Sequence, residues 1–65
     1  MTLDELTEAY ERELRLLEDW MHYREIIANT EGEAGELRRR ATDLRIQECN
    51  AKLQTLENML NIKPQ

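Results

Sequence analysis

Apolar residues recur every three or four positions over residues 2–28, which is the spacing of one face of an α-helix. The main row comprises Leu3, Leu6, Tyr10, Leu14, Leu17, Met21 and Ala28. A second row beside it comprises Ala9, Leu16, Trp20, Tyr23 and Ile27. Together the rows cover about half of the helix circumference, which is wider than the roughly 100° stripe of an ordinary surface helix. We therefore expect this helix to contact two neighbours.

A second helical pattern extends over about residues 31–62, and its apolar positions change face along the way. One row comprises Ala34, Leu37, Ala41 and Leu44, and the next comprises Ile46, Cys49, Leu53, Leu56 and Leu60. Taken as a single seam, this pattern has a period of about 3.8 residues, longer than the 3.5 of a left-handed coiled coil. Two different neighbours, a local helix distortion or a right-handed wrap would each account for it. We favour two neighbours, because the first helix requires the same.

Both predicted helices begin at a capping box, in which a Thr side chain and a Glu three residues later satisfy each other's backbone N–H groups. Thr2 with Glu5 marks the first start, and Thr30 with Glu33 marks the second. The two boxes favour two helices over one uninterrupted helix.

The connection between the helices is predicted near residues 29–35, where Gly32 and Gly35 each weaken a helix by about 1 kcal/mol relative to Ala. Pro64 is expected to stop the second helix. The sequence thus predicts an all-α fold with a single domain over residues 1–65. Its architecture is a two-helix antiparallel hairpin, in which the leucines of the main rows pack together.

The chain of 65 residues is too short to bury a large core, since domains of this size bury only about 60% of their unfolded surface. Cys49 is the only cysteine, so no internal disulfide can compensate. One Cys and one His also fall short of the usual four ligands of a structural zinc. We therefore expect the hairpin to form a homo-oligomer, with a dimer and a four-helix bundle favoured, or to pack on a larger protein.

Charge is distributed unevenly along the chain, whose net charge is −5. Residues 1–36 carry eleven acids against three arginines, a balance of −8, and residues 37–65 carry six bases against three acids, a balance of +3. Opposite halves favour a hairpin, although exposed ion pairs contribute only ~0–1 kcal/mol each. No signal peptide and no apolar run long enough to cross a membrane is visible, so a cytoplasmic location is expected.

No residue pattern predicts catalysis, a cofactor, a metal or a small-molecule substrate. The acids around Gly32 and Gly35 would repel a phosphate, and the alternating ligands of a calcium loop are missing. Asp19 and His22 have the spacing of a metal-binding pair, but they fall on the charged face and His22 is the only histidine. We expect a non-enzymatic protein.

The aromatic residues of the first helix are the best candidates for contact with a partner, because Trp and Tyr are frequent among the residues that dominate binding energy. The predicted partner interface comprises Leu16, Trp20, Tyr23 and Ile27. Burial in the bundle core is the alternative for these side chains.

Arginines form the one basic cluster, which comprises Arg38, Arg39, Arg40 and Arg45. Such a cluster can contact nucleic-acid phosphates or an acidic partner. Nucleic acid is disfavoured, because the chain is acidic overall and nearby acids offset the cluster. Ion pairs across the hairpin or to a partner protein are the favoured use.

The favoured function is therefore a helical-hairpin protein–protein interaction module, self-associating or acting as a small adaptor or assembly subunit. One alternative is a small acidic inhibitor or regulator, of the kind that phages and mobile elements encode, bound to a nucleic-acid-processing protein. A hairpin dimer that binds RNA or DNA through the arginine cluster is the third hypothesis.

Overall fold

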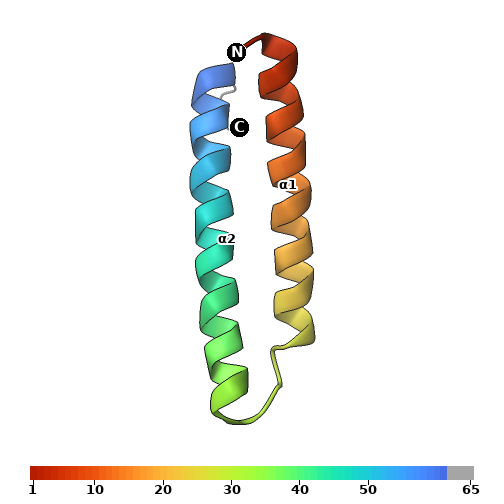
Figure 1. Ribbon diagram of the computed structural model, residues 1–65, viewed down its shortest axis with the longest axis vertical. Helices are drawn as coiled ribbons and strands as arrows, with labels where there is room; N and C mark the ends of the chain where they lie inside the picture. Colours follow the sequence, from red (N-terminus) through yellow and green to blue (C-terminus); the bar gives the residue numbers. More distant parts are fainter. Residues whose placement is uncertain (62–65) are drawn as a thin grey trace.

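The computed structural model describes residues 1–61, which form two antiparallel α-helices joined by a turn (Figure 1). Helix α1 spans Leu3–Ile26 and helix α2 spans Gly32–Leu60. The molecule is elongated, with principal extents of 46 × 21 × 16 Å. The predicted all-α hairpin is confirmed, and the helix boundaries differ from the prediction by no more than two residues. The turn precedes Gly32 and is shorter than the predicted 29–35.

The start of α1 follows the predicted capping box. The Glu5 backbone N–H donates to Thr2 Oγ1 at 3.2 Å, and the Thr2 N–H donates to Glu5 Oε1 at 3.2 Å. Two N–H groups that the helix itself cannot satisfy are thus bonded locally. The helix start is therefore determined by these two side chains.

The start of α2 differs from the prediction, because Thr30 and Glu33 do not form the predicted capping box. Glu31 is the cap residue, and its side chain makes no capping hydrogen bond. Gly32 follows with a φ of +85°, a conformation that residues with a Cβ rarely adopt. The chain therefore enters α2 through a glycine-specific backbone turn, and not through a threonine cap.

The end of α2 is also a backbone feature. Asn61 adopts the left-handed conformation, with a φ of 59°, and its N–H is directed at the carbonyls of Glu57 and Asn58. Asn is among the residues that tolerate this conformation after a helix. The predicted stop at Pro64 lies outside the described residues.

The two helices meet along positions that alternate in steps of three and four, the heptad spacing of a coiled coil. On α1 the less exposed positions include Leu6, Tyr10, Glu13, Leu17, Trp20, Arg24 and Ile27. On α2 they include Gly35, Arg39, Thr42, Ile46, Cys49, Leu53, Leu56 and Leu60. We call these positions the seam. It follows one face of each helix throughout.

The seam therefore stays on one face of α2, although the apolar residues of the helix change from one face to another along the sequence. Near the turn it continues through small and polar residues such as Gly35 and Thr42, which are both buried. Thr42 satisfies its hydroxyl by donating to the Arg38 carbonyl at 2.7 Å. Leu37 and Leu44 are exposed. Since α2 is one continuous α-helix, local distortion is not the cause of the apolar pattern.

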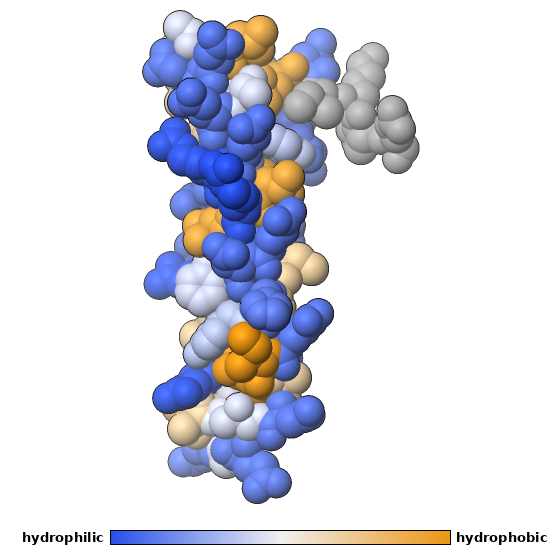
Figure 2. All heavy atoms as spheres, turned by 90° about the vertical axis from the view of Figure 1, so that its right-hand side faces the viewer, coloured by the Kyte–Doolittle hydropathy of each residue, from blue (hydrophilic) through white to orange (hydrophobic). Residues whose placement is uncertain are grey.

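The interior of the hairpin is thin. Among the described residues the buried hydrophobic side chains are those of Ile27, Cys49 and Leu53. Leu3 and Met21, which the sequence pattern predicts to be buried within the hairpin and bundle, lie off the seam and are 68% and 52% exposed in the hairpin. Figure 2 shows apolar patches between polar residues along the face of the molecule that α1 presents. Two helices alone leave much of their apolar surface in water.

Two polar contacts that cross the hairpin each join a donor on α1 to an acid on α2. Arg24 Nε donates to Asp43 Oδ1 at 2.7 Å. The Tyr10 hydroxyl donates to Glu57 Oε1 at 3.2 Å. Loss of water contact, this hydrogen bond and the charge of Glu57 raise the pKa of Tyr10 above its ordinary value. Neither helix of the described chain is long and apolar enough to cross a membrane.

Arg39 lies in the seam of α2 and binds the backbone of the connecting turn. Its guanidinium donates to the Thr30 carbonyl at 2.6 Å and to the Ile27 carbonyl at 3.4 Å. Both carbonyls belong to residues that follow the last turn of α1, where backbone acceptors have no partner within the helix. The arginine thus ties the end of α1 to α2.

We expect Arg39→Met, which keeps most of the aliphatic stem, to lower the free energy of unfolding by about 1–2 kcal/mol, because two backbone acceptors lose a charged donor. Arg40→Met is the matched control. Arg40 is 74% exposed and pairs with Glu36 one turn away, so its loss should change stability by less than about 0.5 kcal/mol. Urea unfolding followed by circular dichroism measures both values, and equal effects of the two variants would contradict the assignment.

Candidate interaction groove

A groove follows one side of the hairpin between α1 and α2. It consists of three hollows of about 390, 250 and 210 Å³. The first and second hollows share Glu13 and Lys52, and the second and third share Trp20 and Arg45. Because adjoining hollows share walls, they form one continuous surface feature, which we call the groove.

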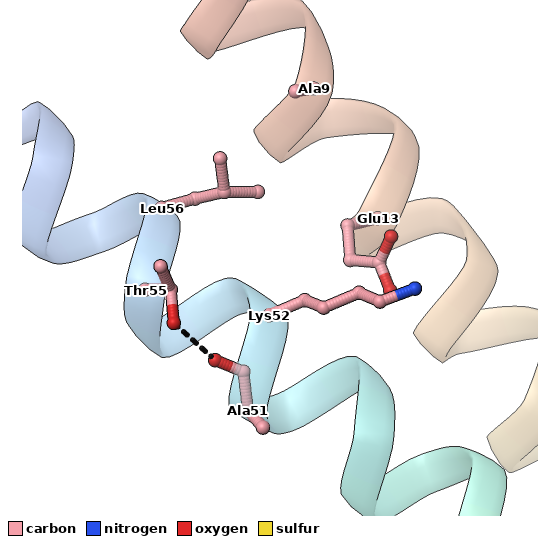
Figure 3. Close-up of a pocket in the computed structure, with 6 residues that line it drawn as sticks. All are labelled: Ala9, Glu13, Ala51, Lys52, Thr55 and Leu56. Carbon is pink, nitrogen blue, oxygen red and sulfur yellow. Dashed lines mark hydrogen bonds between the residues drawn. The ribbon is translucent and has the colours of Figure 1, made fainter.

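The hollow farthest from the turn is mainly apolar, with Ala9 on α1 and Ala51 and Leu56 on α2 among its lining residues. Figure 3 shows Leu56 pointing toward α1 and Lys52 reaching from α2 toward Glu13. Glu13 Oε1 is buried and has no hydrogen-bond partner among the described residues. This end of the groove thus combines apolar walls with a buried carboxylate oxygen, and the same carboxylate lies near the Cys49 thiol.

Cys49 lies in the seam beside Glu13 and lines the middle hollow. Its thiol is buried, and burial together with the neighbouring Glu13 carboxylate raises the pKa of Cys49 above the ordinary value of 9.0. A thiol in these surroundings stays protonated and unreactive at neutral pH. Cys49 therefore serves as a small apolar residue of the interior.

The raised pKa of Cys49 predicts a pH dependence of stability. The unfolded chain ionises this thiol at a lower pH than the folded chain, so the stabilisation is complete below the unfolded pKa and is lost as pH rises through the folded pKa. We expect the urea midpoint of the wild type to fall between pH 8 and pH 10.5 by more than that of Cys49→Ala. Parallel pH profiles of the two proteins would contradict the burial of a neutral thiol.

Aromatic side chains line the hollow nearest the turn. Trp20 and Tyr23 pack edge to face, with ring centroids 6.1 Å apart and an interplanar angle of 73°. Across the same hollow lie Arg38, Ala41 and Arg45 of α2. Aromatic residues and arginines are both enriched at the centres of protein–protein interfaces. Their combination in this hollow therefore suits contact with a partner protein.

Three of the four residues predicted for a partner interface line the groove. Leu16 is 42% exposed and lies in the middle hollow. Trp20 lines the two hollows nearer the turn, and Tyr23 lines the last one. Ile27 is the exception: its side chain is buried in the seam, so it is not accessible to a partner. The approach of the two helices at the turn covers it.

The arginine cluster is divided by the fold. Arg38 and Arg45 line the groove. Arg39 lies in the seam and binds the turn, and Arg40 pairs with Glu36 at 2.8 Å on an exposed surface. Four arginines that are close in sequence thus point in three directions, because successive helical residues are rotated by about 100°.

Lys52 is a groove residue that sequence reasoning did not single out. It lies seven residues after Arg45, which itself lies seven after Arg38. All three are exposed and line the groove from α2. We call them the basic column. Their equal spacing was the available signal, because residues seven apart share one face of a helix.

No metal site is present within residues 1–61, where no group of three His, Cys, Asp or Glu side chains could hold an ion. Asp19 and His22 are both exposed on α1.

Comparison of the chain with protein-family models, with curated proteins and with solved structures finds no match. Inference about function therefore starts from the groove itself.

Proposed function

We propose that this chain is a non-enzymatic helical-hairpin module for protein–protein interaction, and that it self-associates through the groove. The observation that carries the proposal is the imbalance between buried and exposed apolar residues. Within residues 1–61, three hydrophobic side chains are buried, whereas nine large ones are exposed, Leu16 and Tyr23 of the groove among them. Burial of such side chains is the main favourable contribution to folding and to association.

The accessible surface supports the same proposal. The hairpin exposes 5334 Å². A compact monomer of 7.8 kDa exposes about 4,400 Å². The excess is of the same order as the roughly 800 Å² that each partner contributes to an interface of standard size. The hairpin thus exposes more surface than a compact chain of its mass, which favours burial against a further surface.

The test is the mass in solution of the wild type and of two matched variants. We expect the wild type to associate with increasing concentration in sedimentation equilibrium. Leu16→Glu, which places a charge in the groove, should weaken association by at least about tenfold, the equivalent of 1.4 kcal/mol. Leu44→Glu is the control, because Leu44 is more exposed, at 56%, and does not line the groove. Circular dichroism verifies that both variants remain helical.

A wild type that stays a folded monomer at every concentration would overturn the proposal. So would a folded Leu16→Glu variant that associates as strongly as the control.

The other hypotheses have less support. A small acidic inhibitor of a nucleic-acid-processing protein would present an acidic surface to it, but Arg12 and Arg15 stand beside Glu8 and Glu11 on α1. Nucleic-acid binding by the arginine cluster requires free guanidinium groups, but Arg39 is bonded to the turn. Self-association through the groove requires no rearrangement of these residues.

A further inference from the structure

A second row of charge lies on α1, away from the groove. Glu11, Glu18 and Glu25 are seven residues apart and exposed. None of them lines any of the three hollows. None forms an ion pair with another of the described residues. We call these residues the acidic column. Arg15 stands beside Glu11 but forms no ion pair with it among the described residues.

The acidic column has the same length as the basic column of the groove. Each extends over fourteen residue-to-residue steps, from Glu11 to Glu25 or from Arg38 to Lys52, which is about 21 Å on an α-helix. Successive charges are about 10.5 Å apart in both. A helix that carries the acidic column can therefore align all three of its acids with all three bases, in either direction.

We propose that the groove of one copy of this chain binds α1 of a second copy, with the acidic column of the second copy against the basic column of the first. This inference rests on the proposed self-association and specifies which surfaces meet. The charges between the columns steer and align the two copies, while apolar contact supplies the affinity.

The apolar residues between the charges differ in size on the two helices. On α1, Leu14 and Met21 alternate with the acids, and Met21 is exposed. On α2, Ala41 and Glu48 lie between the bases, each four residues before the next base. Glu48 pairs with Arg45 at 3.5 Å, so only Ala41 offers a small side chain to the other helix. This arrangement permits the close packing of a knob into a hole at Ala41.

The two surfaces that meet are different, so the contact is heterologous. Each copy that fills a groove leaves its own groove open for the next copy. Such contacts close into a ring or continue as a chain, whereas a twofold dimer would stop at two. The mass should therefore rise beyond that of a dimer with increasing concentration, and salt should weaken the assembly by screening the exposed charges.

A charge exchange tests the pairing. One variant reverses the basic column (Arg38→Glu, Arg45→Glu and Lys52→Glu) and another reverses the acidic column (Glu11→Lys, Glu18→Lys and Glu25→Lys). Each alone should associate on the order of 100-fold more weakly than the wild type, because three attractive pairs become repulsive. An equimolar mixture should regain association, as should a single chain that carries both reversals. Sedimentation gives the masses and circular dichroism the helix content.

The matched control is a chain with Glu8→Lys, Glu31→Lys and Glu33→Lys, which has the same net charge as the variant with the reversed acidic column. These three acids are exposed and lie outside that column, so association should stay within about threefold of the wild type or increase slightly.

Folded reversal variants that associate as the wild type does, or a mixture that stays monomeric, would overturn the pairing of the columns. If Leu16→Glu abolishes association while the reversals have no effect, self-association through the groove stands and the column pairing is wrong. A monomeric wild type overturns both.

Discussion

Replacing Gly35 with alanine should unfold a large part of the population. Gly35 lies in the second turn of α2, directly against the backbone of Thr30 in the connecting turn. An added Cβ would clash with the Thr30 carbonyl oxygen and would stand 2.8 Å from its carbon. Neither atom can move without displacing the turn that Arg39 holds. We expect Gly35→Ala to lower the free energy of unfolding by about 2–3 kcal/mol.

This loss is large for a chain of this size, because a single core of fewer than about 70 residues rarely supplies more than about 3–5 kcal/mol. Thermal and urea unfolding by circular dichroism measure it. Gly32→Ala is the comparison: its Cβ would meet nothing within 4 Å, and its cost of about 1–2 kcal/mol would come from the positive φ alone. If Gly35→Ala were neutral or stabilising, the close approach at the turn would be incorrect.

Leu53→Ala should have an effect of similar size for a different reason. Leu53 is 7% exposed and is one of the three buried hydrophobic side chains of the hairpin. Its truncation removes apolar contact and leaves a cavity that the helix backbones cannot fully close. We expect the free energy of unfolding to fall by about 2–3 kcal/mol, toward the lower end for buried leucines because the interior is thin.

The matched control for this prediction is Leu44→Ala, which makes the same chemical change on the same helix. Leu44 is exposed, so its truncation should alter stability by less than about 0.5 kcal/mol at concentrations where the chain is monomeric. Urea titrations at low concentration separate the two variants. Equal losses would show that α2 packs through another face than the one described.

Local rules predicted the helices well, because helix formation depends on interactions between residues close in sequence. The apolar spacing and the Thr2–Glu5 box located α1 to within two residues at either end. Thr30 and Glu33 have the same spacing but form no capping box. Instead, the guanidinium of Arg39, nine residues after Thr30, donates to the Thr30 carbonyl. The helix begins at Gly32, which adopts a positive φ.

The seam could not be predicted from apolar residues alone. Near the turn the seam passes through Gly35, which packs against the Thr30 backbone, and then through Arg39 and Thr42. Leu37 and Leu44 lie on another face of α2 and are exposed. The sequence pattern indicated a change of face because it followed hydrophobicity, whereas the seam keeps a heptad spacing whatever the polarity of its residues.

The candidate site was likewise predictable from the sequence only in part. Sequence alone indicated Leu16, Trp20 and Tyr23 as contact residues, because their type and their place on a broad apolar arc are local properties. Only the tertiary structure showed that Ile27 is covered and that Arg39 serves the turn. Those outcomes depend on which side of each helix meets the other.

The sequence by itself thus determined two helices, their approximate ends and an apolar surface too large for one hairpin, all of which follow from periodicity and chain length. The tertiary structure decided which residues form the seam and which line the groove. It also decided that Arg38, Arg45 and Lys52 form one row beside that groove. The physical reason is that the burial of a side chain depends on which faces of the two helices meet. The sequence of one helix alone does not determine that.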